Sequence, residues 1–325
     1  MKNLLFTSLV ILSFFSAQAQ QINPLIDQED LANQQKWVDS IYGNMSLQEK
    51  VGQLFMVDLY SSDPPAKVNK VKALIENQYI GGVIFSKGGP IRQVRLNNEF
   101  QKLSGTPLMM AMDAEWGLAM RLDSTYAFPW NMTLGAIKDD RIVEKVGKRI
   151  GEHVKRMGMH INFGPVLDIN TNPKNPIIGN RSFGEDKLNV TQKALAFMQG
   201  MQSTGVLANA KHFPGHGDTA ADSHHTLPLL NFDKVRLDSI ELYPYKKVFD
   251  AGVGSVMTAH LNIPSLESNG NLPTSLSKSV VTDLLQNELG FNGLIITDGL
   301  NMRGATDYAT SAEVDLSAIQ AGNDL

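Results

Sequence analysis

Short apolar runs alternate with longer amphipathic stretches along most of the chain. Seven apolar runs have the length and composition of buried strands, and they occupy residues 55–59, 82–85, 108–113, 160–167, 207–212, 255–259 and 294–298. Between several of them the spacing of apolar residues predicts helices over residues 65–78, 91–103, 139–157, 187–203, 234–251 and 278–289. Two further helices are predicted before the first strand, over residues 27–42 and after Ser46, where Ser46-Leu47-Gln48-Glu49 has the form of a capping box.

Strands that alternate with helices predict a parallel sheet with crossover connections. Such a sheet is either an open doubly wound sheet or a closed (β/α)8 barrel of the TIM type. Polar residues end or directly follow many of the strands, and these are Asp113, Asp168, Lys211, His212, His260 and Asp298. In a barrel all of these strand ends meet at one mouth, whereas a doubly wound sheet concentrates its site at one crevice. We therefore predict an α/β fold of the (β/α)8 TIM type.

The number of strands falls one short of a complete barrel. Seven are found, and residues 321–325 have the composition of a strand that is about to begin. We expect a barrel that is incomplete at the C-terminus of this chain, and a sequence that forms the first part of a longer polypeptide. The alternative is that the amino-terminal segment closes the gap.

The first nineteen residues differ from the rest of the chain. Met1-Lys2-Asn3 is a short basic start, residues 4–15 are apolar, and Ala17 and Ala19 are small residues at the cleavage positions. This pattern predicts a signal peptide over residues 1–19 and one domain over residues 20–325, with no integral membrane segment after signal removal. The mature protein is then secreted or periplasmic. An uncleaved membrane anchor is the alternative.

Composition narrows the classes of function. The chain has 325 residues, 42% of them hydrophobic and 19% charged, and this is typical of a globular protein with a sizeable core. A net charge of −4 without a basic stripe argues against nucleic acid as a partner. Cysteine is absent, which excludes disulfides, thiolate nucleophiles and a lipidated N-terminal cysteine.

Residues 211–228 carry the densest group of reactive side chains. They include four of the seven histidines and run from a buried strand into an irregular loop rich in glycine and proline. The four histidines could bind zinc, but their spacing matches none of the H-E-x-x-H type motifs, so we predict no metal and no cofactor. Each polar residue also has a structural alternative, since strand-end aspartates often cap helices and arginines often form surface ion pairs.

Three motifs carry a resemblance to a known family. Lys-His-Phe-Pro-Gly-His-Gly-Asp-Thr over residues 211–219, Asp-Ser-His over 222–224 and Ile-Ile-Thr-Asp-Gly-Leu-Asn-Met over 295–302 resemble those of family 3 glycoside hydrolases. The sequence is most similar to the β-N-acetylglucosaminidase branch, whose known roles include trimming N-acetylglucosamine (GlcNAc) from peptidoglycan fragments. The resemblance covers nearly all of the chain after the predicted signal peptide. It implies a retaining exo-β-N-acetylglucosaminidase whose partner is a GlcNAc-containing glycan or muropeptide.

The resemblance also implies roles for individual residues in the reaction. Asp298 corresponds to the nucleophile, and His224 to the general acid/base, with Asp222 as its partner. Lys211 and His212 correspond to residues that bind sugar hydroxyls in the first subsite.

Three more substrate-binding residues are implied by the resemblance. Asp113 and Arg121 match an aspartate and a later arginine of the family's first motif, and Arg181 matches an arginine near the acetamido side of the substrate. The chain departs from the frequent Asp-Gln-Glu-Gly-Gly-Arg form of this motif, because Trp116 and Leu118 replace the first of the two glycines and the arginine. The expected consequence is a change in the outer wall of the pocket, and hence in the preferred leaving group.

These residue types suit glycoside hydrolysis. A retaining glycosidase needs a carboxylate that attacks the anomeric carbon and a proton donor that later activates water. An imidazole can do the second task near neutral pH.

The alternatives to this function are a family 3 β-glucosidase, a GlcNAc phosphorylase or an inactive carbohydrate-binding module. The Asp-Ser-His loop argues against the glucosidase branch, and the presence of both Asp298 and His224 argues against an inactive module. A phosphorylase stays open, since a neutral histidine admits an anionic acceptor.

Overall fold

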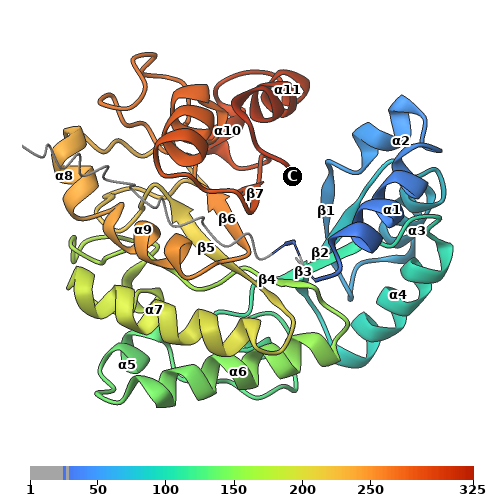
Figure 1. Ribbon diagram of the computed structural model, residues 1–325, viewed down its shortest axis with the longest axis horizontal. Coiled ribbons are helices and arrows are strands. Elements are labelled where there is room, and N and C mark those ends of the chain that lie inside the picture. Colours follow the sequence, from blue (N-terminus) through green and yellow to red (C-terminus); the bar gives the residue numbers. More distant parts are fainter. Residues whose placement is uncertain (1–24, 27–28) are drawn as a thin grey trace, which may run out of the picture.

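The computed structural model of the chain describes residues 25–26 and 29–325 (Figure 1). The predicted signal peptide, residues 1–19, lies outside the described residues. Within the described part of the chain, no helix has both the length and the apolar character needed to cross a membrane.

Seven strands form one curled parallel sheet in which each strand pairs with the next along the chain. The strands are β1 Met56–Tyr60, β2 Gly82–Lys87, β3 Met109–Met112, β4 Ile161–Asn162, β5 Leu207–Phe213, β6 Ser255–Thr258 and β7 Leu294–Thr297. All seven predicted strands are present, and their order is that of a TIM-type barrel. The predicted fold class, an incomplete (β/α)8 barrel, is confirmed.

Helices connect the strands and cover the outside of the sheet (Figure 1). The helices longer than one or two turns are α1 Leu31–Tyr42, α3 Pro65–Glu76, α4 Pro90–Leu103, α6 Asp140–Arg156, α7 Lys187–Gln202, α9 Tyr243–Asp250, the π-helix η4 Ser279–Glu288 and α11 Ser311–Ala321. The short ones are α2 Leu47–Gly52, η1 Leu118–Met120, α5 Asn131–Gly135, η2 Gly179–Arg181, α8 Lys234–Ser239, η3 Thr274–Leu276 and α10 Arg303–Thr306. The predicted capping box of Ser46 and Glu49 is present at the start of α2.

Two predicted elements are wrong in extent, and a proline accounts for each. The strand predicted over residues 160–167 is regular only at Ile161–Asn162, because Pro165 has no N–H to donate to a sheet ladder. The helix predicted over residues 234–251 is two helices, α8 and α9. Pro244 lies in the first turn of α9, where a missing N–H costs nothing, and in the interior of one long helix it would have clashed with the preceding turn.

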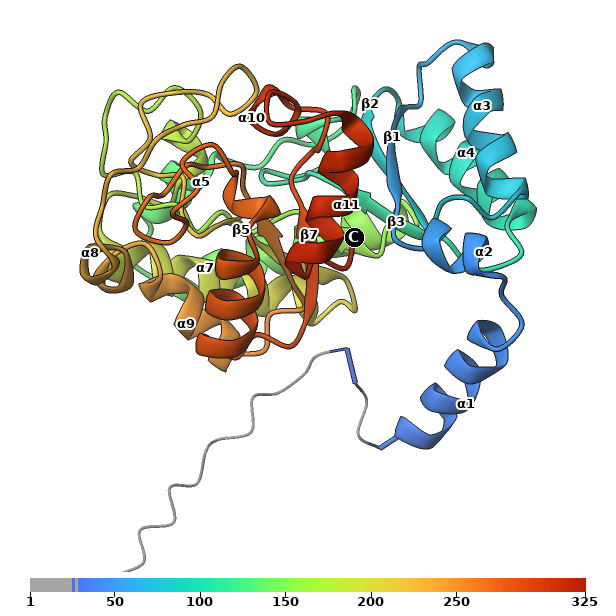
Figure 2. The ribbon, with the colours of Figure 1, turned by 90° about the horizontal axis from the view of Figure 1, so that it is seen from above.

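The two ends of the sheet do not pair with each other. Beyond β7 the backbone of Asp324 and Leu325 exchanges hydrogen bonds with Ile295 and Thr297, as an eighth strand beside β7 would, at N···O distances of 2.8–3.1 Å. Figures 1 and 2 place this end of the chain between β7 and β1. The described residues before β1 form α1 and α2, which are not part of the sheet. Helix α1 has no buried residue and stands apart in Figure 2.

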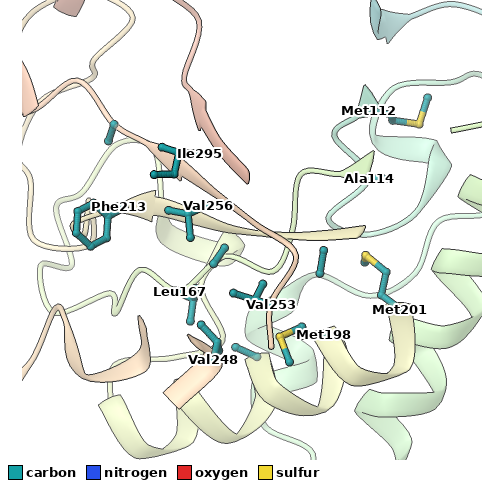
Figure 3. Packing of buried hydrophobic residues seen from close by; sticks show 14 of the residues in the cluster. Met112, Ala114, Leu167, Met198, Met201, Phe213, Val248, Val253, Val256 and Ile295 are labelled. Carbon is teal, nitrogen blue, oxygen red and sulfur yellow. The ribbon is translucent and has the colours of Figure 1, made fainter. Parts of the chain in front are cut away.

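Apolar side chains fill the space between the sheet and the helices. In Figure 3, Met198 and Met201 point from α7 toward the strands, where Val256 of β6 and Ile295 of β7 belong to the same buried cluster. A second, smaller cluster lies on the inner side of the curl and consists of Ala111, Ile161, Phe163, Met257 and Ile296. Both faces of the strands are therefore buried.

Candidate active site

One cavity of about 800 Å³ extends from the carboxyl ends of the strands into the inside of the curl, where Met257 and Ile296 line it, and to the gap between β7 and β1, where Met56 and Leu325 line it. Seven of the eight predicted site residues line it, and these are Asp113, Arg121, Arg181, Lys211, His212, His224 and Asp298. The eighth, Asp222, is bonded to His224. The structure therefore brings together side chains that the sequence separates by up to 185 residues, from Asp113 to Asp298.

A buried lysine joins two carboxylates at the floor of this cavity. The Lys211 ammonium is only 2% exposed and lies 2.7 Å from Asp113 Oδ1 and 2.8 Å from Glu115 Oε1. Arg121 forms a second ion pair with Asp113. Burial favours the neutral form of the Asp113 carboxyl, but Lys211 and then Arg121 outweigh it, so the pKa of Asp113 lies well below its usual range.

Glu115 holds Arg181 through two parallel hydrogen bonds. Arg181 Nη2 donates to Glu115 Oε1 at 2.7 Å, and its Nε donates to Oε2 at 3.0 Å. The Glu115 side chain is completely buried. Burial opposes its ionisation, yet Arg181 and Lys211 lower the pKa of Glu115 to about 2. The sequence prediction omitted Glu115, although it follows Asp113 by two residues in the same motif.

His212 is fixed between a carboxylate and a guanidinium. Its Nδ1 lies 2.6 Å from Asp168 Oδ2, and its Nε2 lies 3.2 Å from Arg181 Nη2. Because a guanidinium only donates, Nε2 is the acceptor and Nδ1 carries the proton that goes to Asp168. Burial raises the pKa of Asp168, but His212 outweighs this effect and the pKa lies below its usual value. Asp168 stands at a strand end in the sequence but was not among the predicted site residues.

Asp298 directly follows β7 and faces the cavity. Its own backbone N–H donates to Thr258 O of β6 at 2.9 Å, and the Gly299 N–H donates to its Oδ1 at 2.8 Å. Burial opposes ionisation, but His260, His212 and the Gly299 amide outweigh it and lower the pKa of Asp298. The carboxylate is therefore ionised, as a nucleophile requires.

His224 and Asp222 form a pair on the loop of residues 214–228. His224 Nδ1 lies 2.7 Å from Asp222 Oδ1, and the His224 backbone N–H donates to the same oxygen at 2.8 Å. Since a carboxylate only accepts, Nδ1 carries a proton and Nε2 is free for chemistry. Burial raises the pKa of Asp222, but hydrogen bonds and the charge of His224 outweigh it and keep the pKa low. His224 is 59% exposed, unlike the floor of the cavity.

The two departures from the family motif lie away from the cavity wall. Trp116 stacks on Trp130, with ring centroids 4.1 Å apart, and Leu118 is buried in the main core. Neither is among the described residues that line the cavity, whereas Met120 and Arg121 are. These two positions therefore do not line this cavity, and the expected change in the outer wall of the pocket stays a prediction.

The described residues contain no group of three or more His, Asp or Glu side chains arranged to hold a metal ion. Three of the four histidines of residues 211–228 have close hydrogen-bond partners in the protein, and the fourth, His225, is 80% exposed with its ring 3.9 Å from Asp222. His212 and His216 bond to buried groups, and His224 pairs with Asp222.

A TIM-type barrel with a carboxylate at one strand end and a histidine–carboxylate pair on a loop holds the groups that retaining glycoside hydrolysis requires. Residues 46–325 match the glycosyl hydrolase family 3 N terminal domain, and the chain belongs to this family. A relative named beta-hexosaminidase A, from Pseudoalteromonas piscicida, is 33% identical over 79% of this chain and 47% of its own length.

Two solved structures extend the comparison. A family 3 beta-N-acetylglucosaminidase from Paenibacillus sp. str. FPU-7 is 37% identical, with a TM-score of 0.80 over 86% of this chain and 54% of that one. The beta-glucoside phosphorylase BglX is 27% identical, with a TM-score of 0.86 over 94% of this chain and 55% of that one. The chain spans about half the length of these relatives.

The buried charge of Glu115 has a measurable consequence for stability. We predict that Glu115→Gln lowers the free energy of unfolding at pH 7 by on the order of 3 kcal/mol, because it leaves Arg181 and Lys211 short of one negative charge. A carboxyl whose pKa is lowered on folding stabilises the protein above its unfolded pKa, about 4.3, and loses this contribution as the pH falls toward 2. Denaturant unfolding at pH 7, 4 and 3 should therefore show the deficit of the variant shrinking with acidification.

Glu152→Gln, on the outer face of α6, is the matched control. Its pair with Arg149 is exposed, so the change should alter the unfolding free energy by less than about 0.5 kcal/mol. A deficit of Glu115→Gln that is the same at every pH would show that the charge of this carboxylate is not what stabilises the fold.

Proposed function

We propose that the protein is an exported retaining exo-β-N-acetylglucosaminidase that removes terminal β-linked GlcNAc, with peptidoglycan fragments as the substrate class. The observation that supports this most directly is the single cavity lined by Asp298, by His224 and by five fixed polar groups. The membership of this chain in family 3 and its similarity to a solved beta-N-acetylglucosaminidase support the same proposal. The predicted signal peptide supports export.

The reaction proceeds in two steps. In the first, Asp298 attacks the anomeric carbon while the bond to the leaving oxygen breaks, and His224, as an imidazolium protonated at both nitrogens, gives that oxygen its Nε2 proton and becomes neutral. In the second, His224 takes a proton from water, the water oxygen attacks the anomeric carbon, and Asp298 departs as a carboxylate. Asp222 orients the imidazole and stabilises the imidazolium that forms in this step.

The floor of the cavity supplies sugar recognition. Lys211 and Arg121 donate hydrogen bonds and Asp113 accepts them, so these three suit the hydroxyls of one terminal pyranose. Arg181 suits the acetamido side, and His212, whose Nε2 lies 3.2 Å from Arg181 Nη2, suits a neighbouring hydroxyl. Each of these groups is held by a buried partner, so little ordering is needed when substrate binds.

A phosphorylase is the second candidate. The similarity to a beta-glucoside phosphorylase over 94% of this chain favours it, as does a histidine in the acid/base position. A neutral imidazole, unlike a second carboxylate, does not repel phosphate. In that case phosphate replaces water in the second step and the product is a sugar 1-phosphate.

Substrate choice tests the proposed function. We predict that kcat/KM for an aryl β-GlcNAc glycoside exceeds that for the aryl β-glucoside by at least roughly 100-fold, because groups that bind the acetamido side go unpaired with glucose. Both substrates are assayed with and without phosphate, and the products are separated. An equal or better rate on the glucoside contradicts the proposal, and a sugar 1-phosphate as main product establishes the second candidate instead.

The roles of the two catalytic residues predict different behaviour on different leaving groups. Asp298→Asn should remove nearly all activity on every substrate. His224→Ala should slow cleavage of a GlcNAc disaccharide by roughly 10²–10⁴-fold, yet spare the first step on an aryl glycoside whose phenol leaves without a proton. Asp222→Asn should fall between His224→Ala and the wild type.

His225→Ala is the control, because this neighbouring histidine is 80% exposed and lies 3.9 Å from Asp222. It should change neither rate by more than about twofold. If His224→Ala slows both substrates equally, or slows neither, then His224 is not the acid/base.

A further inference from the structure

Ser223 lies between Asp222 and His224 in the sequence. It is buried, whereas these two neighbours are much more exposed. Its exposed fraction is 3%, whereas the side chains of Asp222 and His224 are 30% and 59% exposed. The serine is therefore packed into the protein at the edge of the cavity, while its neighbours are open to solvent. The loop is anchored on either side by Asn172, which donates to the carbonyl oxygens of Asp218 and Thr219, and by Asn262, whose N–H donates to Pro228 O, while Ser223 supplies the contacts beside the pair itself.

Two hydrogen bonds hold Ser223. The Gly304 N–H at the start of α10 donates to its carbonyl oxygen at 3.0 Å, and its hydroxyl lies 3.3 Å from His216 Nε2. A Cβ on Gly304 would lie 2.9 Å from that carbonyl oxygen and 3.0 Å from His260 Cβ, so only glycine allows this approach. The backbone contact is thus built into the packing, and the side-chain contact rests on His216.

The direction of the His216 bond follows from its other partners. Asn175 Nδ2 donates to Thr219 Oγ1 at 3.3 Å, and the Thr219 hydroxyl donates its only proton to His216 O at 3.1 Å. Thr219 Oγ1 can then only accept from His216 Nδ1, 2.6 Å away. Burial lowers the pKa of His216 to about 4, so the ring is neutral at pH 7 and its Nε2 accepts from Ser223.

His216 is itself tied to the sugar-facing side of the cavity. Its backbone N–H donates to Asp168 Oδ1 at 2.6 Å, and the other oxygen of Asp168 accepts from His212 at 2.6 Å. One buried carboxylate therefore positions both the imidazole proposed to meet the sugar and the residue that supports the acid/base segment.

We propose that His216 is a positioning residue, which accepts a hydrogen bond from Ser223 and so holds the His224–Asp222 pair at the distance from the sugar site that proton transfer needs. The inference rests on the proposed role of His224. Because the Gly304 contact stays when the Ser223 hydroxyl is lost, the segment loosens and does not leave the cavity.

Ser223→Ala and His216→Met remove this bond, and His216→Gln keeps an acceptor oxygen near the place of Nε2. In the full chain, we expect the first two variants to lower kcat on a GlcNAc disaccharide roughly 3- to 10-fold with KM within about twofold, since one neutral hydrogen bond is lost and neither residue is among the proposed sugar-binding groups. The first step on an activated aryl GlcNAc glycoside, measured as kcat/KM, needs no acid and should keep its rate. His216→Gln should recover most of the disaccharide rate.

Hydrogen exchange of peptides that cover residues 219–226 gives a readout that does not depend on activity. We expect it to speed up about 3- to 10-fold in Ser223→Ala and His216→Met at pH 7. Ser255→Ala is the control, because it removes an equally buried hydroxyl at the start of β6, at the opposite ends of the strands from the loop. It should change neither the exchange of this segment nor either rate.

Unchanged exchange in the two variants overturns the proposal, and so does an equal loss on both substrates or a His216→Gln variant as slow as His216→Met. Failure of the proposed function looks different. If the wild type cleaves no GlcNAc glycoside, exchange in the absence of substrate still decides whether His216 holds the segment.

Discussion

A lysine ammonium with almost no access to water constrains everything around it. Removing an ammonium from water costs several kcal/mol unless charged partners replace the solvent, and Lys211 finds two, Asp113 and Glu115. Glu115 is in turn compensated by Arg181, and Asp113 by Arg121. The partners come from the end of β3, the loop after it, β5 and η2. All of these segments have to be in place before every one of the charges is satisfied.

This chain of ion pairs makes one half of the candidate site rigid. Its groups are buried, bonded on several sides and fixed to strand ends, so they can bind a sugar with little rearrangement. The other half is of a different kind. The His224–Asp222 pair is exposed on a loop, and its connection to the rigid half runs through Ser223, His216 and Asp168. The proposed chemistry assigns a different task to each half. The rigid half binds the sugar, and the exposed pair donates a proton in the first step and accepts one in the second.

The sequence was informative where local physical rules decide the structure. Apolar runs located all seven strands, and polar strand ends predicted their convergence on one mouth. The break between α8 and α9 was also readable, because Pro244 stands inside the predicted helix. Helix α11 was not predicted, although the capping box of Thr310 and Glu313 at its start is a pattern that the sequence shows. No pattern in the sequence predicts that residues 279–288 form a π-helix.

The site shows the limit of such rules. Side chains that face the cavity were found through motifs, but the carboxylates behind them were not. Glu115 pairs with Arg181, 66 residues away in the sequence, and Asp168 pairs with His212, 44 residues away. Such pairs exist only after the barrel has formed. His216 presents the same difficulty, since its sequence neighbours suggest a metal ligand, while its neighbours in space show a hydrogen-bond acceptor for Ser223.

The assignment of Asp298 as nucleophile is tested most directly by trapping the intermediate. A fluorinated, activated aryl GlcNAc glycoside slows the second step, so the glycosyl-enzyme accumulates and can be quenched in acid for peptide mass analysis. We predict one fluorinated GlcNAc unit per chain, linked to the peptide that contains Asp298. A label on a different peptide, or a burst of released phenol with no label on the protein, would contradict the assignment.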